Sequence, residues 1–457
     1  MPLIKNNTYQ AEITGYTSEG MGVCKIDGNV VFVNNAVKGD IANIKIVKIT
    51  KNISYGIISE LLTPSGNRIQ TECPVAQKCG GCTLWHMTYE EELEFKREKV
   101  ENVVKRIGKV DFDVKEIVGS SLTKRYRNKA QYPVADENGR AVCGFYRKNT
   151  HDIVQNPDCL IQTEKSNEIA NFITDFLNKH KIPAYNEQKN TGFVRHIYMR
   201  TGFKTGEIML CVVTTSFDIP KLELLIAQIR EKFPKVITFM LNKNAKVTNQ
   251  ILGEQYKTLF GDGEIRDILC DNEFNIAPQS FYQVNRQAAE NLYEKAIEFC
   301  DFSGDETALD MYCGVGTITL AVARHVKEVT GIEIVPNAIE NARKNALKNN
   351  ISNADFVVGD AKEAVKRFEN KKIDVIIVDP PRKGLDIDTI QSIIKISPKK
   401  LTYVSCDPAT LARDIKIFTE NGYALKNVVA FDLFPRTFHV ECITLMTRSG
   451  KTPKNEG

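Results

Sequence analysis

From residue 308 onward, the chain alternates strand-like and helix-like runs. The strand-like runs are residues 308–312, 329–334, 355–358, 375–378 and 401–405, and a helix-periodic run follows each of them. Such alternation is typical of a doubly wound α/β fold, in which right-handed crossovers build a parallel sheet. Two final runs, residues 424–431 and 440–447, have no long helix between them. We therefore expect these two runs to form an antiparallel pair at the edge of the sheet.

The first sixty residues follow a different pattern, because short β-rich runs alternate there with glycine-containing turns. This spacing predicts a small five-stranded β-barrel of the oligonucleotide-binding kind, a fold that also occurs as a mere spacer. Residues 120–270 mix strand-like and helix-like runs, which indicates a central α+β unit. The predicted domains are residues 1–61, 62–270 and 271–450, followed by a polar tail at residues 451–457.

Composition narrows the cellular setting and the kind of partner. No apolar run approaches the ~18 residues of a membrane span, and the N-terminus has no signal-like segment, so we expect a cytoplasmic protein without membrane contact. Its 12 cysteines are then thiols, metal ligands or catalysts rather than disulfides. Seven basic and two acidic residues lie between positions 120 and 150, a local excess above the net charge of +4 for the whole chain. Any contact with nucleic acid is therefore expected at this cluster.

Polar side chains close the first four strands of the predicted parallel sheet. A glycine loop that includes Gly314 follows the first strand, and Glu333, Asp360 and Asp379 follow the next three. The loop lacks the third glycine of a dinucleotide fingerprint and alone could be a tight turn. Glu333 lies 19 residues after Gly314, where a carboxylate can accept hydrogen bonds from a ribose. Together these positions favour a mononucleoside ligand without pyrophosphate, which fits S-adenosylmethionine better than NAD.

Cys406 closes the fifth strand and is followed by Asp407, Pro408 and a helical run. The positive end of a helix dipole favours the nucleophilic thiolate form of a thiol at the helix N-terminus, although a cysteine can equally be a small buried core residue. Asp379-Pro380-Pro381 alone could indicate methylation of an exocyclic amino group, which needs no thiol. A thiolate added to C6 of uracil instead makes C5 nucleophilic, and a base must later remove the C5 proton. Glu441 can supply that base, unless it is a surface charge on an edge strand.

Taken together, these motifs resemble the RNA uracil-5-methyltransferase family, in particular its iron–sulfur branch acting on large-subunit ribosomal RNA. The resemblance spans nearly the whole chain and rests on residues 280–285, 310–316, 379–382, 405–408 and 439–441, with Cys73, Cys79, Cys82 and a distant Cys159. It implies a Rossmann-like class I methyltransferase domain, an N-terminal TRAM barrel and a central cluster-binding domain.

The resemblance also implies roles for single residues. Cys406 would be the nucleophile and Glu441 the base. The implied cofactor contacts are Gln283, Tyr312, Gly314, Glu333, Asp360 and Asp379. A family asparagine is replaced by Thr317 here, which leaves that side-chain contact in question. Cys73, Cys79, Cys82 and Cys159 would hold a [4Fe-4S] cluster, although the spacing of four thiolates suits zinc as well.

The implied substrate is RNA, with 23S ribosomal RNA favoured and transfer RNA as the alternative. A non-catalytic RNA-binding factor is a further alternative, but binding alone needs neither Cys406 nor Glu441. Within the basic run 124–129, cations could bind phosphate while Tyr126 and the later Tyr132 stack on unpaired bases, unless the run is a solvated face. A uracil within folded RNA would have to be flipped out to reach the thiol. No obligate protein partner is evident.

Overall fold

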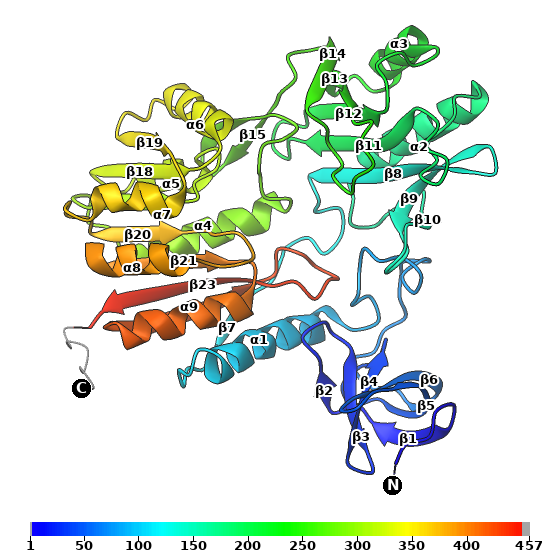
Figure 1. Ribbon diagram of the computed structural model, residues 1–457, viewed down its shortest axis with the longest axis horizontal. Coiled ribbons are helices and arrows are strands. Elements are labelled where there is room, and N and C mark those ends of the chain that lie inside the picture. The colour runs from blue at the N-terminus through cyan, green and yellow to red at the C-terminus, as the bar shows by residue number, and fades with distance from the viewer. Residues whose placement is uncertain (1, 450–457) are drawn as a thin grey trace.

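The computed structural model describes residues 2–449, so the predicted polar tail at 451–457 lies outside the described residues. Three large sheets and one hairpin follow one another along the chain (Figure 1). None of the helices in the described part of the chain is long and apolar enough to cross a membrane.

The first sheet is the N-terminal barrel. Its strands are β1 (Thr8–Glu12), β2 (Gly15–Tyr16), β3 (Gly22–Ile26), β4 (Asn29–Asn34), β5 (Ile41–Ile49) and β6 (Ser54–Thr63), in the order β1-β5-β6-β4-β3-β2. Inward-facing side chains such as Val31, Val33 and Ile44 are fully buried and form its core. The barrel therefore has six strands instead of the five expected, because the two-residue β2 is too short to leave a pattern in the sequence.

The second sheet forms the centre of the chain. Its strands are β8 (Lys129–Glu137), β9 (Arg140–Tyr146), β10 (Ile153–Gln155), β11 (Val194–Thr201), β12 (Ile208–Thr214), β13 (Val236–Lys243) and β14 (Gln255–Phe260). Helices α2 (Glu164–Lys179) and α3 (Leu222–Lys232) share one hydrophobic cluster with one face of this sheet. Alternate residues of β12, such as Met209 and Val213, belong to a second hydrophobic core, which they share with the third sheet and its helices. The central sheet is thus buried on both faces.

The third sheet is the predicted doubly wound one. Its main strands are β17 (Thr307–Met311), β18 (Glu328–Glu333), β19 (Ala354–Val358), β20 (Val375–Val378), β21 (Lys400–Ser405), β22 (Tyr423–Phe431) and β23 (Glu441–Arg448). The strand order is β19-β18-β17-β20-β21-β23-β22-β7, and the first five are parallel. The predicted Rossmann-like sheet is confirmed. The strand order reverses between β17 and β20, and ligands of such sheets bind at that point.

Helices cover both faces of this sheet. The helices of the first face are α4 (Arg286–Cys300), α5 (Thr317–Ala323) and α6 (Pro336–Lys348), which share a core with the hairpin β15 (Ile265–Leu269) and β16 (Asn272–Ile276). The second face carries α7 (Ala361–Ala364), the 3₁₀ turn Val365–Phe368, α8 (Ile387–Ile396) and α9 (Pro408–Glu420).

The antiparallel pair is present, but it is not the edge of the sheet. β23 lies between β21 and β22, and β22 is followed by the parallel strand β7 (Glu116–Val118). Helix α1 (Tyr89–Arg106) also packs on the second face, beside α9, through Val100 and Val104 (Figure 1). Residues 89–118 thus contribute to the C-terminal layers, while the domain boundaries at 61 and 270 stay predictions.

Candidate active site

A cavity of about 450 Å³ lies at the carboxyl ends of the first strands of the third sheet. Tyr312, Glu333 and Asp360 line it, together with residues of the segment from Pro381 to Asp388. Glu333 accepts hydrogen bonds from the amides of Val335 (2.9 Å) and Gly314 (3.2 Å). Each carboxylate oxygen has a further lone pair. Glu333 can therefore still accept a hydroxyl of a bound ribose.

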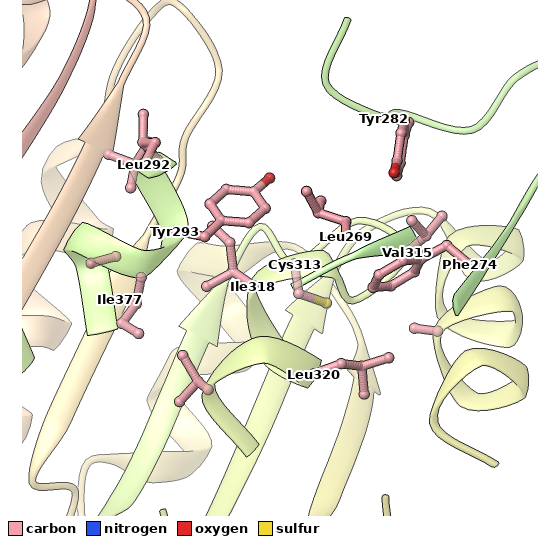
Figure 2. Packing of buried hydrophobic residues seen from close by; sticks show 14 of the residues in the cluster. Leu269, Phe274, Tyr282, Leu292, Tyr293, Cys313, Val315, Ile318, Leu320 and Ile377 are labelled. Atoms are coloured by element: carbon pink, nitrogen blue, oxygen red, sulfur yellow. The ribbon is translucent and has the colours of Figure 1, made fainter. Parts of the chain in front are cut away.

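The glycine loop beside this cavity is fixed by packing from outside. Figure 2 shows Leu269 and Phe274 of the hairpin and Tyr293 of α4 gathered around Cys313 and Val315. A Cβ on Gly316, at φ +85°, would meet Phe356 at 3.2 Å, so the backbone needs a glycine there. Gly314, at φ +55°, would meet nothing within 4 Å. The loop is held on one side and leaves open space over Gly314.

Three predicted cofactor residues lie outside this lining. Within residues 2–449, the lining of the cavity includes none of Gln283, Gly314 and Asp379. Gln283 is buried, and its carbonyl accepts a hydrogen bond from Asn128 Nδ2 at 2.8 Å. Asp379 retains some contact with solvent, yet the protein packed around it raises its pKa to about 7. Its charge raises the pKa of Cys406 and of Glu441, so Asp379 lies near the predicted catalytic pair.

Cys406 and Glu441 lie side by side at the end of the β21–β23 ladder. Ser405, the last residue of β21, pairs with Cys442 of β23, so Cys406 and Glu441 each lie one residue beyond this pair, and the charge of Glu441 acts on the Cys406 thiol. The pKa of the half-buried Cys406 thiol is raised to about 11, first by burial and then by the charges of Glu441 and Asp379. The expectation that the helix dipole favours the thiolate is thus wrong for the protein alone. The Asp407 carboxylate caps the first amides of α9.

Glu441 is buried, with 4% of its surface exposed. The alternative of a surface charge on an edge strand is therefore wrong. Its pKa is raised to about 8, first by burial and then by the charge of Asp379. A carboxyl group with a pKa near neutrality can exchange a proton within a catalytic cycle. The arrangement thus places a thiol and a carboxyl group near each other.

Two neighbours of this pair were not assigned roles from the sequence. The Arg382 guanidinium lowers the pKa of both Cys406 and Glu441 and thereby favours their anionic forms. His439 has its pKa lowered to about 4, first by burial and then by Arg382, so its imidazole is neutral at pH 7. Both belong to motifs quoted above, at the ends of residues 379–382 and at the start of 439–441. These motifs could have drawn attention to Arg382 and His439, but the sequence does not show that the two side chains lie near Cys406 and Glu441.

A second group of candidate residues lines another cavity. Cys73, Cys79, Cys82 and Cys159 line one cavity of about 60 Å³, among apolar side chains that include Trp85. All four are free thiols, and burial and then the neighbouring Cys159 raise the pKa of Cys82 to about 12. In the part of the chain that the structure describes, no group of three His, Cys, Asp or Glu is arranged to hold a metal ion. The shared cavity and the four sulfur donors nevertheless fit a cluster held by cysteines.

The proposed stacking residues are buried. Tyr126 and Tyr132 are 1% and 2% exposed, so the expectation that they stack on RNA bases is wrong. Their hydroxyls donate hydrogen bonds inside the protein, from Tyr126 to the Pro435 carbonyl (3.1 Å) and from Tyr132 to Asn167 Oδ1 (2.7 Å). Tyr132 lies on β8 and Tyr126 in the segment before it, and both rings belong to hydrophobic clusters inside the protein.

Comparisons with known proteins agree with this geometry. A family model described as tRNA (Uracil-5-)-methyltransferase matches residues 269–449, and one described as TRAM domain matches residues 4–58. Proteins named "Uncharacterized RNA methyltransferase" are similar in Clostridium tetani (41% identical over 456 residues, 99% of each chain) and in Bacillus cereus (43% over 453 residues, 98% of each).

Among solved structures, the tRNA (uracil-54, C5)-methyltransferase of Pyrococcus abyssi in complex with S-adenosyl-L-homocysteine matches with a TM-score of 0.78 and 29% identity. The match covers 96% of this chain and 99% of that one. The predicted resemblance to the uracil-5-methyltransferase family is thereby confirmed, its iron–sulfur branch stays a prediction, and the N-terminal barrel is a TRAM domain. The chain belongs to the RNA uracil-5-methyltransferase family.

Proposed function

We propose that the protein methylates C5 of uracil in RNA through a covalent adduct between Cys406 and C6, with Glu441 as the general base. The observation that carries this proposal is the nearness of the Cys406 thiol to the buried Glu441 carboxyl, one residue beyond the last pair of the β21–β23 ladder. A non-catalytic RNA-binding factor would need neither group. Burying the Glu441 carboxyl destabilises the folded protein, and a catalytic role explains why the group is buried nonetheless.

S-Adenosylmethionine is the proposed cofactor, and it supplies an electrophilic methyl group when bound. Tyr312, Glu333 and Asp360 would hold its nucleoside part, because they line the 450 Å³ cavity. Gln283 and Asp379 stay predicted contacts outside this lining. Gly314, with open space above it, would let the cofactor approach the backbone closely.

The reaction then divides between two side chains. The Cys406 thiolate, favoured by Arg382, forms a bond to C6, and the electron pair of the C5=C6 bond moves toward C5. C5 would then take the methyl group from the bound donor, whose bond between sulfur and the methyl carbon breaks and leaves S-adenosylhomocysteine. The Glu441 carboxylate removes the remaining proton from C5, the double bond re-forms, and the bond between sulfur and C6 breaks. The cycle returns Cys406 as a thiolate and leaves Glu441 protonated, ready to lose its proton to solvent.

This mechanism predicts that two variants fail at different steps. Cys406→Ala should abolish methylation, because no adduct can form. Glu441→Gln should still form the adduct but release it slowly, which gives an RNA-bound band that resists denaturation. Cys270→Ala, a free and half-buried cysteine in a turn, is the matched control and should behave as wild type. Methylation by Cys406→Ala would overturn the covalent mechanism.

We propose 23S ribosomal RNA as the substrate, on the resemblance of the cysteine pattern to the ribosomal branch of the family. Transfer RNA is the second candidate, because the similar Pyrococcus abyssi protein is named for a transfer RNA uracil. The TRAM barrel and the cationic side chains of residues 124–129 are the proposed RNA contacts. Mass-spectrometric mapping of 5-methyluridine in ribosomal and transfer RNA from cells lacking the gene decides between them.

Cys73, Cys79, Cys82 and Cys159 are proposed to hold a [4Fe-4S] cluster with a structural role. Their common apolar cavity supports a shared ligand, and the family resemblance favours iron over zinc. The purified protein should be brown, absorb broadly around 400 nm and contain iron. Cys82→Ala should lose both colour and iron, whereas Cys143→Ala, a cysteine outside this set, should keep them. A colourless protein that contains zinc would contradict the proposal.

A further inference from the structure

The loop of residues 432–440 joins β22 to β23 and delivers His439 and Glu441 to the site. Phe431, directly before this loop, is the ladder partner of Glu441, directly after it. The position of the base therefore depends on how this loop is held. Much of what holds it comes from helix α1, more than three hundred residues earlier in the chain.

A buried ion network fixes the start of the loop. Lys96 Nζ on α1 lies 2.7 Å from Glu92 Oε1 and 2.7 Å from Asp432 Oδ1, and all three side chains are fully excluded from solvent. The backbone amide of Arg436 donates to Glu92 Oε1 at 2.7 Å, and its guanidinium lies 3.5 Å from Glu92 Oε2. Two cations and two anions thus balance one another inside the protein.

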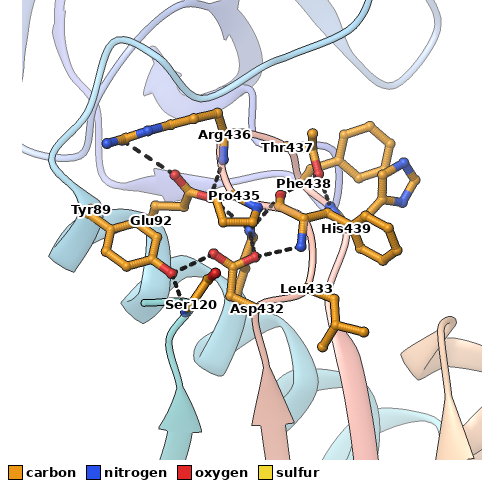
Figure 3. Close-up of polar contacts among 12 residues, drawn as sticks. Tyr89, Glu92, Ser120, Asp432, Leu433, Pro435, Arg436, Thr437, Phe438 and His439 are labelled. Atoms are coloured by element: carbon orange, nitrogen blue, oxygen red, sulfur yellow. Dashed lines mark hydrogen bonds and ion pairs between the residues drawn. The ribbon is translucent and has the colours of Figure 1, made fainter. Parts of the chain in front are cut away.

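Further hydrogen bonds hold the carboxylate of Asp432. Figure 3 shows Tyr89 and Ser120 beside it. The Tyr89 hydroxyl donates to Asp432 Oδ2 at 2.8 Å and accepts from the Ser120 amide at 2.7 Å. Asp432 Oδ1 also accepts from the amide of Phe434 within the loop (3.1 Å). The carboxylate of Asp432 is therefore fixed from both α1 and its own loop.

The rest of the loop is tied to the same N-terminal segment. Lys99 Nζ, one turn further along α1, donates to the Phe438 carbonyl at 3.0 Å. The amides of Thr83 and Leu84 donate to the Arg436 carbonyl at 2.8 and 3.1 Å. These contacts span the loop from Asp432 to Phe438, next to His439.

Stability alone does not explain such a network, because apolar side chains of similar volume often stabilise a buried site as well or better. A general base, in contrast, must lie within hydrogen-bond reach of the proton it removes, and a misplacement of about 1 Å can cost about a hundredfold in rate. Buried hydrogen-bonded networks rigidify the groups they join, and in this one only Glu92 Oε2 and Arg436 Nε among the atoms of the four side chains are buried without a hydrogen-bond partner in the described part of the chain.

We propose that Glu92, Lys96, Asp432 and Arg436 form a positioning network that sets Glu441 against Cys406. The inference rests on the proposed function, in which Glu441 acts only after methyl transfer. It predicts that damage to the network slows release of the methylated product more than it slows formation of the adduct. General loss of folding would instead reduce both steps together.

The test uses the full-length protein, labelled S-adenosylmethionine and an RNA transcript that the wild type methylates. Single-turnover quenching measures adduct formation and product release separately for Lys96→Met and for Tyr89→Phe. Tyr89→Phe removes only a hydroxyl and keeps the protein testable if Lys96→Met fails to fold. Lys105→Met is the control, since this lysine lies on the last turn of α1 and pairs only with Glu101 and Asp113 among the described residues.

Lys96→Met should slow release about ten- to a hundredfold and accumulate the adduct, as Glu441→Gln does, with a smaller effect for Tyr89→Phe. Lys105→Met should match wild type. Equal slowing of both steps, or unchanged release, would overturn the inference.

Amide hydrogen exchange tests the positioning network independently of the proposed covalent mechanism. The network variants should raise amide exchange in residues 432–441 while leaving α9 as in wild type. If Glu441→Gln forms no adduct, the proposed mechanism fails, and exchange alone decides whether the network holds the loop. Unchanged exchange in residues 432–441 would then overturn the positioning role.

Discussion

Replacing the buried Glu441 by glutamine should stabilise the protein while it impairs catalysis. Glutamine has nearly the same shape but cannot ionise. Burial raises the pKa of Glu441 from its ordinary value of 4.5 to about 8, so folding must keep this group protonated where an unfolded chain would ionise it. The carboxyl therefore supports folding below pH 4.5, and this support is lost as the pH rises toward 8.

The size of the effect follows from these two pKa values. At 1.36 kcal/mol per pKa unit, holding the proton costs about 3 kcal/mol at pH 7 and about 1 kcal/mol at pH 5. Glu441→Gln removes this cost, because the amide has no proton to hold. The stability difference between variant and wild type should consequently grow by about 2 kcal/mol between pH 5 and pH 7.

Urea unfolding of both proteins at pH 5 and pH 7 measures this difference. The control is Glu340→Gln, because Glu340 is exposed on α6, and its hydrogen bond with Lys344 lowers its pKa. That control should show no gain that increases with pH. If Glu441→Gln gains the same stability at both pH values, the carboxyl of Glu441 is not held protonated and the reasoning about its burial is wrong.

Three further outcomes follow from the same charges. Release of product from the adduct should rise about tenfold between pH 7 and pH 9, because a base of pKa about 8 becomes ionised over that interval; a flat profile in quenched single turnovers would contradict it. Arg382→Gln should move the midpoint of this rise to higher pH, since Arg382 lowers the pKa of Glu441; a shift to lower pH would refute its role. Binding of S-adenosylmethionine should release more protons than binding of S-adenosylhomocysteine, because a positive sulfonium favours the ionised form of Asp379, whose pKa is about 7. Calorimetry in buffers of different ionisation enthalpy measures this, and equal release would count against it.

Local patterns sufficed for much of the fold. The five parallel strands of the third sheet and their helices were predictable, because periodicity records which face of an element is buried. The attachment of β7 to β22 was not, since a three-residue strand carries no period of its own. The inward orientation of Tyr126 and Tyr132 was missed for a related reason. An aromatic residue among cations has the same sequence pattern whether it faces RNA or the core.

The candidate site was predictable in its members but not in its electrostatics. Strand ends directed attention to Glu333, Asp360 and Cys406, because the carboxyl ends of parallel strands meet at one edge. The sign of the pKa shift at Cys406 was not accessible, since it depends on burial and on the nearness of Glu441 and Asp379. The helix dipole belongs to α9, which follows the thiol, whereas the two carboxyl groups that raise its pKa come from other strands.

The reversed strand β23 explains how Glu441 reaches Cys406. In a parallel sheet, every strand ends at the ligand-binding edge, so a residue at the start of a parallel strand lies at the opposite edge. An antiparallel strand inserted among parallel ones begins where its neighbours end. β23 is inserted directly beside β21, and its first residue, Glu441, is thereby brought next to the residue that follows Ser405. Had β22 been inserted beside β21 in its place, β22 would have separated Glu441 from Cys406. The position of one strand in the sheet thus decides whether the thiol has a neighbouring carboxyl group.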